Sequence, residues 1–218
     1  PVYKAPAAMP LAYNWSGFYI GANIGYGWGD SKSGLVDFYD PAFAGSIPGH
    51  SYDMNGVIGG GQIGYNQQFG NTVFGLEADF SGTGMKGSVT DPVFGYTATS
   101  SIDWLSTVRG RLGLTFDRSM VYATGGVAIG RVKNKLDDIY GADVITTTST
   151  TTHVGWTIGA GIETALSPNW SVRAEYLYVD LGSENNNHYE PNPPGWSQIS
   201  YDSSVTASIA RVGVNYKF

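Results

Sequence analysis

The sequence contains no cysteine, no long apolar run and few charged residues. Without cysteine, disulfide bonds and thiol chemistry are excluded. No stretch of about 18 consecutive apolar residues occurs, which excludes a transmembrane helix. Charged residues make up only 14% of the chain and the net charge is -6. This argues against a nucleic-acid partner, because phosphate binding needs clustered Lys and Arg.

Glycine and aromatic residues are abundant instead, with 31 Gly and 14% aromatic residues. The chain ends on an alternating segment, in which Arg211, Gly213, Asn215 and Lys217 interleave with Val212, Val214, Tyr216 and Phe218. Such a pattern predicts a strand with one apolar and one polar face.

Eight segments share this period of two, and they are predicted to be strands. Their approximate bounds are 17–28, 56–69, 72–84, 101–116, 120–132, 153–165, 170–181 and 204–218. The connections alternate in length: Gly70-Asn71, 117–119 and 166–169 are tight, and the others run to roughly 15–25 residues, longer than is usual in a compact soluble domain. Gly70-Asn71 is expected to have positive φ at both positions.

The predicted fold class is all-β, an eight-stranded antiparallel transmembrane β-barrel with short periplasmic turns and four long extracellular loops. Residues 1–14 are expected to form a flexible periplasmic tail, and residues 15–218 the barrel in the bacterial outer membrane. The start at Pro1 is interpreted as a processed mature end. The alternative is a soluble barrel such as a lipocalin, with its apolar face inward. Aromatic residues near the strand ends favour the membrane barrel, because rings suit a membrane–water interface. This predicted girdle consists of Trp15, Phe18, Trp28, Phe69, Phe116, Trp170, Tyr216 and Phe218.

Charged side chains fall on the opposite face of several strands, and they are predicted to fill the lumen. The set is Glu77, Asp79, Asp103, Arg109, Arg111, Glu163, Arg173, Glu175 and Arg211. An eight-stranded barrel has an interior just wide enough for its own side chains, and enclosed charges must be paired. Depth along the strands matches Glu77 with Arg111, Asp79 with Arg109, Glu163 with Arg173 and Glu175 with Arg211. The cluster is interpreted as a structural core, and the alternative is a narrow polar conduit.

Features of enzymes are weak in this sequence. His153 is expected to be a solvated histidine at a loop edge, without an acid partner at a spacing that suggests catalysis. The acids Asp137, Asp138 and Asp143 do not have the spacing of an EF-hand loop. No catalytic residue, metal site or cofactor is expected. Tyr189 and Trp196 flank a proline-rich loop and are a candidate contact surface, although they could equally pack against neighbouring loops.

Four motifs resemble one family of small alphaproteobacterial outer-membrane proteins, the outer-membrane immunogenic or opacity-like porin family. They lie at residues 14–29 (NWSGFYIGANIGYGWG), 122–128 (YATGGVA), 155–163 (GWTIGAGIE) and 174–182 (AEYLYVDLG). The resemblance covers nearly the whole chain. It implies an eight-stranded outer-membrane barrel whose C-terminal aromatic, here Phe218, is read by the barrel-insertion machinery.

The resemblance also implies roles that are mostly structural or surface-interactive. Some members carry a tail tethered to peptidoglycan through an Ala-Asp start, whereas this sequence begins PVYKAP, so tethering stays a hypothesis. The expected function is non-enzymatic, a contribution to envelope integrity and surface contacts, with outer-membrane lipids and lipopolysaccharide as partners. The alternatives are a narrow porin for small solutes or ions, and an adhesin or assembly subunit acting through its loops. Self-association of barrels is left open.

Overall fold

The computed structural model describes the backbone of residues 13–33, 36–38, 45–47, 51–91, 96–140, 143–192 and 195–218, and nearly all of it is strand. The strands are β1 (Gly17–Ser33), β2 (Val36–Phe38), β3 (Gly45–Ile47), β4 (Ser51–Phe69), β5 (Thr72–Asp91), β6 (Tyr96–Phe116), β7 (Ser119–Tyr140), β8 (Asp143–Ala165), β9 (Trp170–Asn192) and β10 (Gly195–Lys217). In the described part of the chain, no helix is long and apolar enough to cross a membrane.

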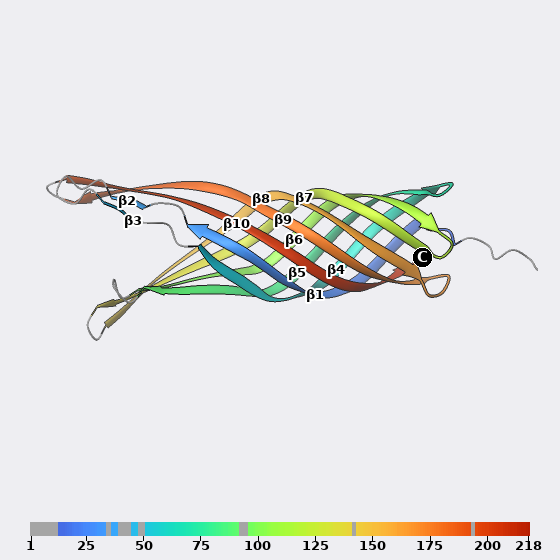
Figure 1. Ribbon diagram of the computed structural model, residues 1–218, viewed down its shortest axis with the longest axis horizontal. Coiled ribbons are helices and arrows are strands. Elements are labelled where there is room, and N and C mark those ends of the chain that lie inside the picture. The colour runs from blue at the N-terminus through green and yellow to red at the C-terminus, as the bar shows by residue number, and fades with distance from the viewer. Residues whose placement is uncertain are drawn as a thin grey trace, which may run out of the picture.

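Eight of these strands close into one antiparallel barrel in the order β1-β10-β9-β8-β7-β6-β5-β4 (Figure 1). The first and last strands close it, from Tyr19 opposite Lys217 to Ser33 opposite Ser203. Strands β2 and β3 form a separate two-stranded ribbon within the connection from β1 to β4. The eight-stranded all-β barrel predicted from the sequence is therefore the fold.

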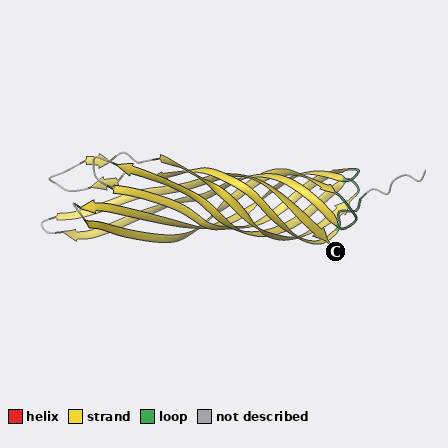
Figure 2. Cartoon of the chain, turned by 90° about the horizontal axis from the view of Figure 1, so that it is seen from below, coloured by secondary structure: helices red, strands yellow, loops and turns green. Residues whose placement is uncertain are grey.

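The tight turns gather at one end of the barrel, where the C-terminus also lies (Figure 2). We call this end the turn end and the opposite end the loop end. Gly70 has a φ of 60° whereas Asn71 does not have positive φ, so only the first turn position needs the conformation that glycine tolerates. The expectation of positive φ at both positions was wrong. Asp117 opens the second turn with a φ of 53°.

Strand pairing continues well past the predicted strand ends at the loop end. Strand β7 was expected to end at Val132 and β8 to begin at His153, yet the ladder runs on to Tyr140 opposite Asp143. The long connections expected at this end are therefore largely paired strand. A transmembrane β-strand needs only about 9–11 residues, so strands of 20 to 23 residues, as in β5 to β10, reach far beyond one bilayer.

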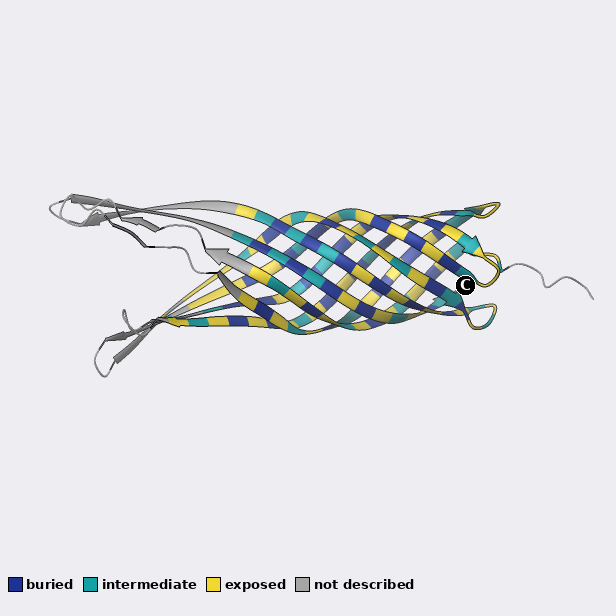
Figure 3. Cartoon of the chain, viewed as in Figure 1, coloured by how far each residue is buried: buried dark blue, intermediate teal, exposed yellow. Residues whose placement is uncertain are grey.

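Where burial is described, it alternates along the eight barrel strands, which gives the barrel a chequered pattern (Figure 3). The outward residues are large and apolar, such as Phe18 at 63% exposure and Leu76 at 68%. The inward residues include Arg109 and Met120, at 1% and 0% exposure. An apolar face turned outward is the arrangement of a barrel in lipid rather than of a soluble lipocalin. On β7, Met120 and Tyr122 point inward and Val121 points outward.

Candidate functional site in the barrel lumen

A layer of paired charges crosses the middle of the lumen. Eight of the nine residues predicted there are buried, with exposures of 1–5%: Glu77, Asp79, Arg109, Arg111, Glu163, Arg173, Glu175 and Arg211. Four guanidinium groups thus face four carboxylates, and their formal charges cancel. An enclosed ion without a partner costs several kcal/mol, so this balance is a condition of stability.

Arg109 joins three carboxylates from two strands. Its Nη2 lies 2.5 Å from Glu77 Oε1 and 3.0 Å from Asp79 Oδ2, and its Nη1 lies 3.1 Å from Glu175 Oε1. Its Nε donates to Thr107 Oγ1 at 2.9 Å. Arg109 is therefore satisfied on three nitrogens, and it ties β5 to β9 across the lumen.

Arg211 from β10 makes the second bridge. Its Nη2 lies 2.6 Å from Glu175 Oε2 and 3.4 Å from Asp79 Oδ2. The pairs Glu175–Arg211 and Asp79–Arg109, matched by depth in the sequence, both occur in the structure. Because Asp79 and Glu175 each contact both Arg109 and Arg211, these four side chains form one connected network.

Two other arginines have exchanged the partners expected from depth. Arg173 Nη1 lies 2.5 Å from Glu77 Oε2, not beside Glu163. Arg111 pairs instead with Glu163. Strands β9 and β5 are diametrically opposite in the ring of eight, so the Arg173–Glu77 pair spans the lumen. Position along a strand predicts which charged residues lie at the same depth in the lumen. It does not predict which strand a long arginine side chain reaches across the lumen.

Neutral side chains that the sequence reasoning missed complete the layer. Tyr19 donates to Glu77 Oε2 at 2.6 Å, and Tyr122 donates to Glu175 Oε1 at 3.1 Å. The Arg111 guanidinium carbon lies 3.6 Å from the centre of the Tyr122 ring, and Asn215 donates to Glu163 Oε1 at 2.8 Å. Parity could have found Tyr19, because it alternates with the outward Phe18 and Ile20.

An apolar layer covers the charges on the loop-end side. Its members come from six strands: Met54, Ile58, Met85, Ile102, Leu105, Ala128, Val132, Leu177, Val179, Leu181, Val205, Ala207 and Ile209. They are exposed by 0–4%. On this side the lumen is filled mainly by methionine and aliphatic side chains, with His153 and Ser81 also buried.

A second apolar layer closes the turn end, and it contains Trp15. This residue was predicted in the outer aromatic girdle, which was wrong: it is only 2% exposed and packs with Val73, Met120, Tyr122 and Ala165. The segment before β1 folds into the barrel mouth, where Trp15 N donates to Gln68 Oε1 at 2.8 Å. An indole inside the mouth removes more apolar surface from water than one at its rim.

Asp103 was predicted in the lumen and is instead exposed on the outer face. The ladder between β6 and β7 shifts between Ile102 and Trp104, so Asp103 is the extra residue of a β-bulge. A bulge resets the parity of the strand beyond it. Accordingly, Ile102 points inward at 3% exposure.

The other predicted girdle residues lie outward near the strand ends. Phe18, Trp28, Phe69, Phe116, Trp170 and Phe218 are 45–70% exposed, and the Tyr216 ring lies 5.1 Å from Trp170 and 5.3 Å from Phe218. The structure adds aromatic pairs towards the loop end, namely Phe80–Trp104, Trp156–Tyr178 and Trp28–Tyr176. These residues could have been identified from the sequence, because they fall on the outward face of their strands at similar distances from the tight turns.

The histidine, the acidic residues and the loop aromatics that the sequence offered for catalysis, metal binding or contact do not form a site in the described residues. His153 was expected to be solvated, and this was wrong, because its side chain points inward and is 5% exposed. Among the residues that the structure describes, no three His, Cys, Asp or Glu side chains gather as metal ligands would. Tyr189 and Trp196 have backbones in β9 and β10, and their side chains lie outside the described residues.

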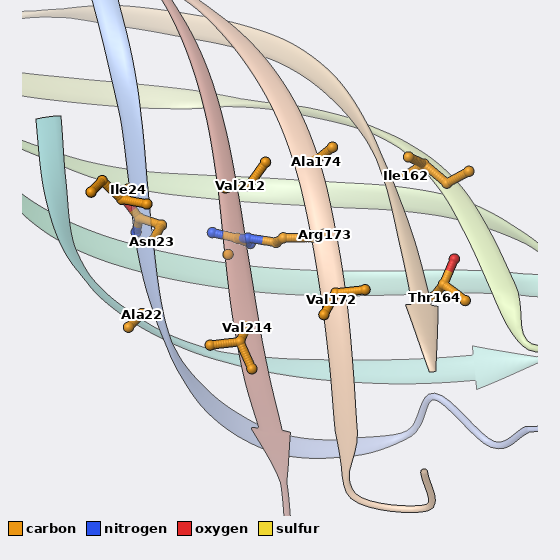
Figure 4. A pocket seen from close by; sticks show the side chains of 11 residues that line it. Ala22, Asn23, Ile24, Ile162, Thr164, Val172, Arg173, Ala174, Val212 and Val214 are labelled. Atoms are coloured by element: carbon orange, nitrogen blue, oxygen red, sulfur yellow. The ribbon is translucent and has the colours of Figure 1, made fainter. Parts of the chain in front are cut away.

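A shallow hollow of about 630 Å³ lies on the outer wall over β1, β8, β9 and β10 (Figure 4). Small residues, Ala22 and Ala174, leave the space, and Val212 and Val214 border it. The lining also includes the inward-pointing Asn23 and Arg173, which meet the hollow beside Gly213.

The whole chain matches known outer-membrane proteins. Residues 3–218 match the model of the outer membrane protein beta-barrel domain family. The chain is 40% identical over 222 residues to a 31 kDa outer-membrane immunogenic protein of Brucella melitensis, covering 99% of this chain and 89% of that protein. It is 30% identical to a 22 kDa outer membrane protein of Rhizobium leguminosarum, covering 97% and 82%.

Solved structures agree with the fold. The outer membrane protein OprG of Pseudomonas aeruginosa matches with a TM-score of 0.54 at 13% identity, over 94% of this chain and 98% of that chain. The outer membrane protease OmpT of Escherichia coli matches with a TM-score of 0.51 at 10% identity, over 97% and 100%. At such identities the likeness concerns the fold alone. Together with the family match, the outward apolar face and the closed barrel show that this chain belongs to the outer membrane protein beta-barrel domain family and resides in the bacterial outer membrane.

Proposed function

We propose that this protein is a closed, non-enzymatic barrel that contributes to outer-membrane integrity through its wall and its outward-facing end. Outer-membrane barrels place short turns in the periplasm, so the turn end faces the periplasm and the loop end faces the cell exterior. The wall is covered by lipid, and the lumen serves to hold the strands together.

The filling of the lumen carries this proposal. The neutral charged layer lies between two layers of apolar side chains, one with Leu105 and Leu177 and one with Trp15 and Met120. An ion that crossed the barrel would have to displace both layers and break pairs such as Arg173–Glu77. Moving an unpaired ion through apolar surroundings costs several kcal/mol, so a passage of this kind opposes conduction.

Single-channel recording tests this directly. The refolded barrel in a planar bilayer is expected to show no steady nanosiemens-scale current, whereas a wide porin in the same bilayer conducts. Steady currents of that size from the pure protein would contradict a closed lumen. In parallel, the same preparation is inserted into lipid vesicles. Recovery of the barrel from them in its heat-modifiable, folded form verifies that it inserts.

The second candidate is a narrow conduit for ions or small solutes, and one observation favours it. Nε and Nη1 of Arg111 and Nε and Nη2 of Arg173 are buried without a hydrogen-bond partner among the described residues. Buried donors of this kind are usually bound to water. Small current steps that change size in Arg173→Met would support the conduit.

The third candidate is an adhesin or assembly subunit, and the long strands favour it. The β7–β8 ladder runs from Ser119 opposite Thr164 to Tyr140 opposite Asp143, and therefore presents folded structure outside the cell. Shortened variants that fold normally but no longer bind host cells or a partner protein would support this role.

Three partner assignments remain part of the proposal. Phe218, 70% exposed at the turn end, is expected to be read by the insertion machinery, and Phe218→Ala should slow assembly without changing the stability of refolded protein.

Tethering to peptidoglycan concerns residues that the structure does not describe. Muropeptide analysis of the native N-terminus tests it. Self-association of barrels through the outer wall is tested by their size in mild detergent.

A further inference from the structure

Four basic side chains gather on the outer face of three adjacent strands near the loop end. Lys86 on β5 pairs with Ser101 on β6, and Ser101 pairs with Lys133 on β7. Direct cross-strand partners share a face, so Lys86 and Lys133 point the same way. Arg131 and Lys135 flank Lys133 at positions of equal parity. We call Lys86, Arg131, Lys133 and Lys135 the basic rim; all four are exposed.

The remaining sector of the same rim is acidic, and it adjoins the basic rim at β4, where Asn55 is the direct partner of Lys86. Asp53 on β4 pairs with Asp30 on β1, Asp30 pairs with Thr206 on β10, and Thr206 pairs with Asp180 on β9. These three carboxylates form the acidic rim. The chain as a whole carries a net charge of -6, so positive charge is concentrated on one sector against the overall balance.

The basic rim lies just above the apolar wall. Arg131 pairs directly with Trp104, whose ring lies 5.7 Å from that of Phe80. Aromatic pairs of this kind mark the membrane–water interface. Towards the turn end, the same strands expose Val108 and Val127 to lipid. The cations therefore lie at the level where the headgroups of the outer leaflet begin.

The charges within the basic rim are only partly compensated. Lys135 Nζ lies 2.8 Å from Asp137 Oδ2, and hydrogen bonds from Lys135 and Thr146 lower the pKa of the Asp137 carboxyl. Asp103 adds a second exposed carboxylate at the bulge. Four cations against these two acids leave a formal charge of +2. Among the ion pairs of the described residues, none joins Arg131 or Lys133 to a carboxylate.

The spacing of the cations suits a headgroup with more than one phosphate. Neighbouring strands are about 4.8 Å apart, so the backbones of Lys86 and Lys133 are roughly 10 Å apart. Arg131 and Lys133, two residues apart on one strand, are separated by about 7 Å. Arginine can bind a phosphate through two parallel hydrogen bonds, and lysine adds a mobile point charge.

We propose that the basic rim binds the phosphorylated headgroup of lipopolysaccharide, with the acyl chains lying along the wall of β6 and β7. Gly110 and Gly125, direct partners on this wall, leave it flat where a chain would lie. The inference rests on the orientation given under the proposed function, with the loop end outside, and does not depend on whether the lumen conducts.

Native mass spectrometry of the barrel in detergent tests the site, with bisphosphorylated lipid A as the probe. The variant K86Q/R131Q/K133Q removes three cations, and the matched control D30N/D53N/D180N removes three charges from the acidic rim. Each basic residue near an anionic lipid surface contributes roughly fivefold to binding, so the triple basic variant should bind about a hundredfold more weakly. The control should bind at least as well as the unmodified protein.

Further arms identify the source of the phosphate. Dephosphorylated lipid A should bind the unmodified protein as weakly as bisphosphorylated lipid A binds the triple variant. Phosphatidylglycerol should bind less tightly, and inorganic phosphate should not compete. Raised salt should weaken binding to the unmodified protein more than to the variant.

Three outcomes overturn the proposal. In the first, the triple variant binds bisphosphorylated lipid A with unchanged affinity. In the second, the triple variant loses as much affinity for dephosphorylated lipid A as for the bisphosphorylated form. In the third, the triple substitution dissociates barrel oligomers, which would show that the basic and acidic rims bind each other. The single variant K133Q, expected to lose roughly fivefold, decides the question if the triple variant does not fold. Conductance of the same preparations separates failure here from failure of the closed-lumen proposal.

Discussion

At the scale of single residues, Arg109 determines whether the charged layer is stable. It contacts Glu77, Asp79 and Glu175 within 3.1 Å, and the carboxylates would repel one another without it. The three acids are also shared with Arg173 and Arg211. Removing one guanidinium therefore leaves excess negative charge in an enclosed space.

Arg109→Met is expected to reduce the free energy of unfolding by about 3–5 kcal/mol, because a buried charge loses its partner. Urea titration of the barrel in lipid vesicles, read as the folded band on unboiled gels, measures the loss. The control is Arg118→Met, an exposed turn residue, which should change stability by less than about 0.5 kcal/mol. Equal behaviour of the two variants would show that the lumen pairs contribute little.

Two glycines on β4 test the faces of one strand. A Cβ at Gly64 would lie 2.4 Å from Cζ of Tyr19, whereas one at Gly61 would meet nothing nearer than Gly21 O at 3.5 Å. Tyr19 cannot move freely, because it donates to Glu77.

Gly64→Ala is therefore expected to cost about 1–3 kcal/mol through overpacking, as measured by the same urea titration. Gly61→Ala should be neutral or stabilise by up to about 1 kcal/mol, since alanine restricts the unfolded chain. A loss of stability in Gly61→Ala alone would contradict the assignment of faces.

The lumen residues were largely predictable from parity, and their partners were not. Alternation places Glu77, Arg109 and Glu175 on the polar face of their strands. It gives no information about which side of the lumen a long arginine side chain reaches, so Arg111 and Arg173 were assigned the wrong acids. Asp103 was misplaced because a single extra residue in β6 reverses parity beyond it, and no residue type at that position signals a bulge.

At the scale of elements, the segment before β1 acts as part of the barrel core. Tyr13 and Trp15 pack edge to face with ring centres 4.8 Å apart, and Lys217 Nζ lies 4.4 Å from the centre of the Tyr13 ring. Lys217 also donates to Asn14 O. These contacts bind the start of β1 to the end of β10, which are the two strands that must meet to close the barrel.

Trp15→Ala should reduce the free energy of unfolding by about 3–5 kcal/mol, because a large buried side chain leaves a cavity. Trp170→Ala, which removes an indole 48% exposed on the outer wall, is the control and should cost less. The loop-end apolar layer is intact in Trp15→Ala, so this variant should remain non-conducting in planar bilayers. A steady current through it would show that Trp15 alone closes the lumen.

At the scale of the whole molecule, the barrel consists of a membrane part and an exterior part with different requirements. Alternation is strict from the turns to the aromatic pairs, because lipid outside and charges inside fix both faces. Further towards the loop end both faces of β8 are exposed, as at the successive residues Thr148, Ser149 and Thr150, so the pattern weakens there. Sequence periodicity therefore predicted the membrane part of each strand but not the continued pairing outside.

The exterior part should be dispensable for folding. Asn134 and Ser149 are direct partners on β7 and β8, so deleting residues 134–149 and joining Lys133 to Thr150 through Asn-Gly leaves every ladder row below intact. The variant should insert and migrate as a folded barrel, with a urea midpoint close to that of the unmodified protein, because the lumen layers lie nearer the turn end. Deleting residues 121–124 and 159–162 instead shortens the ladder within the membrane, removes the lumen residue Tyr122, and should abolish folding. Failure of the first variant to fold would show that the exterior ladder stabilises the membrane barrel.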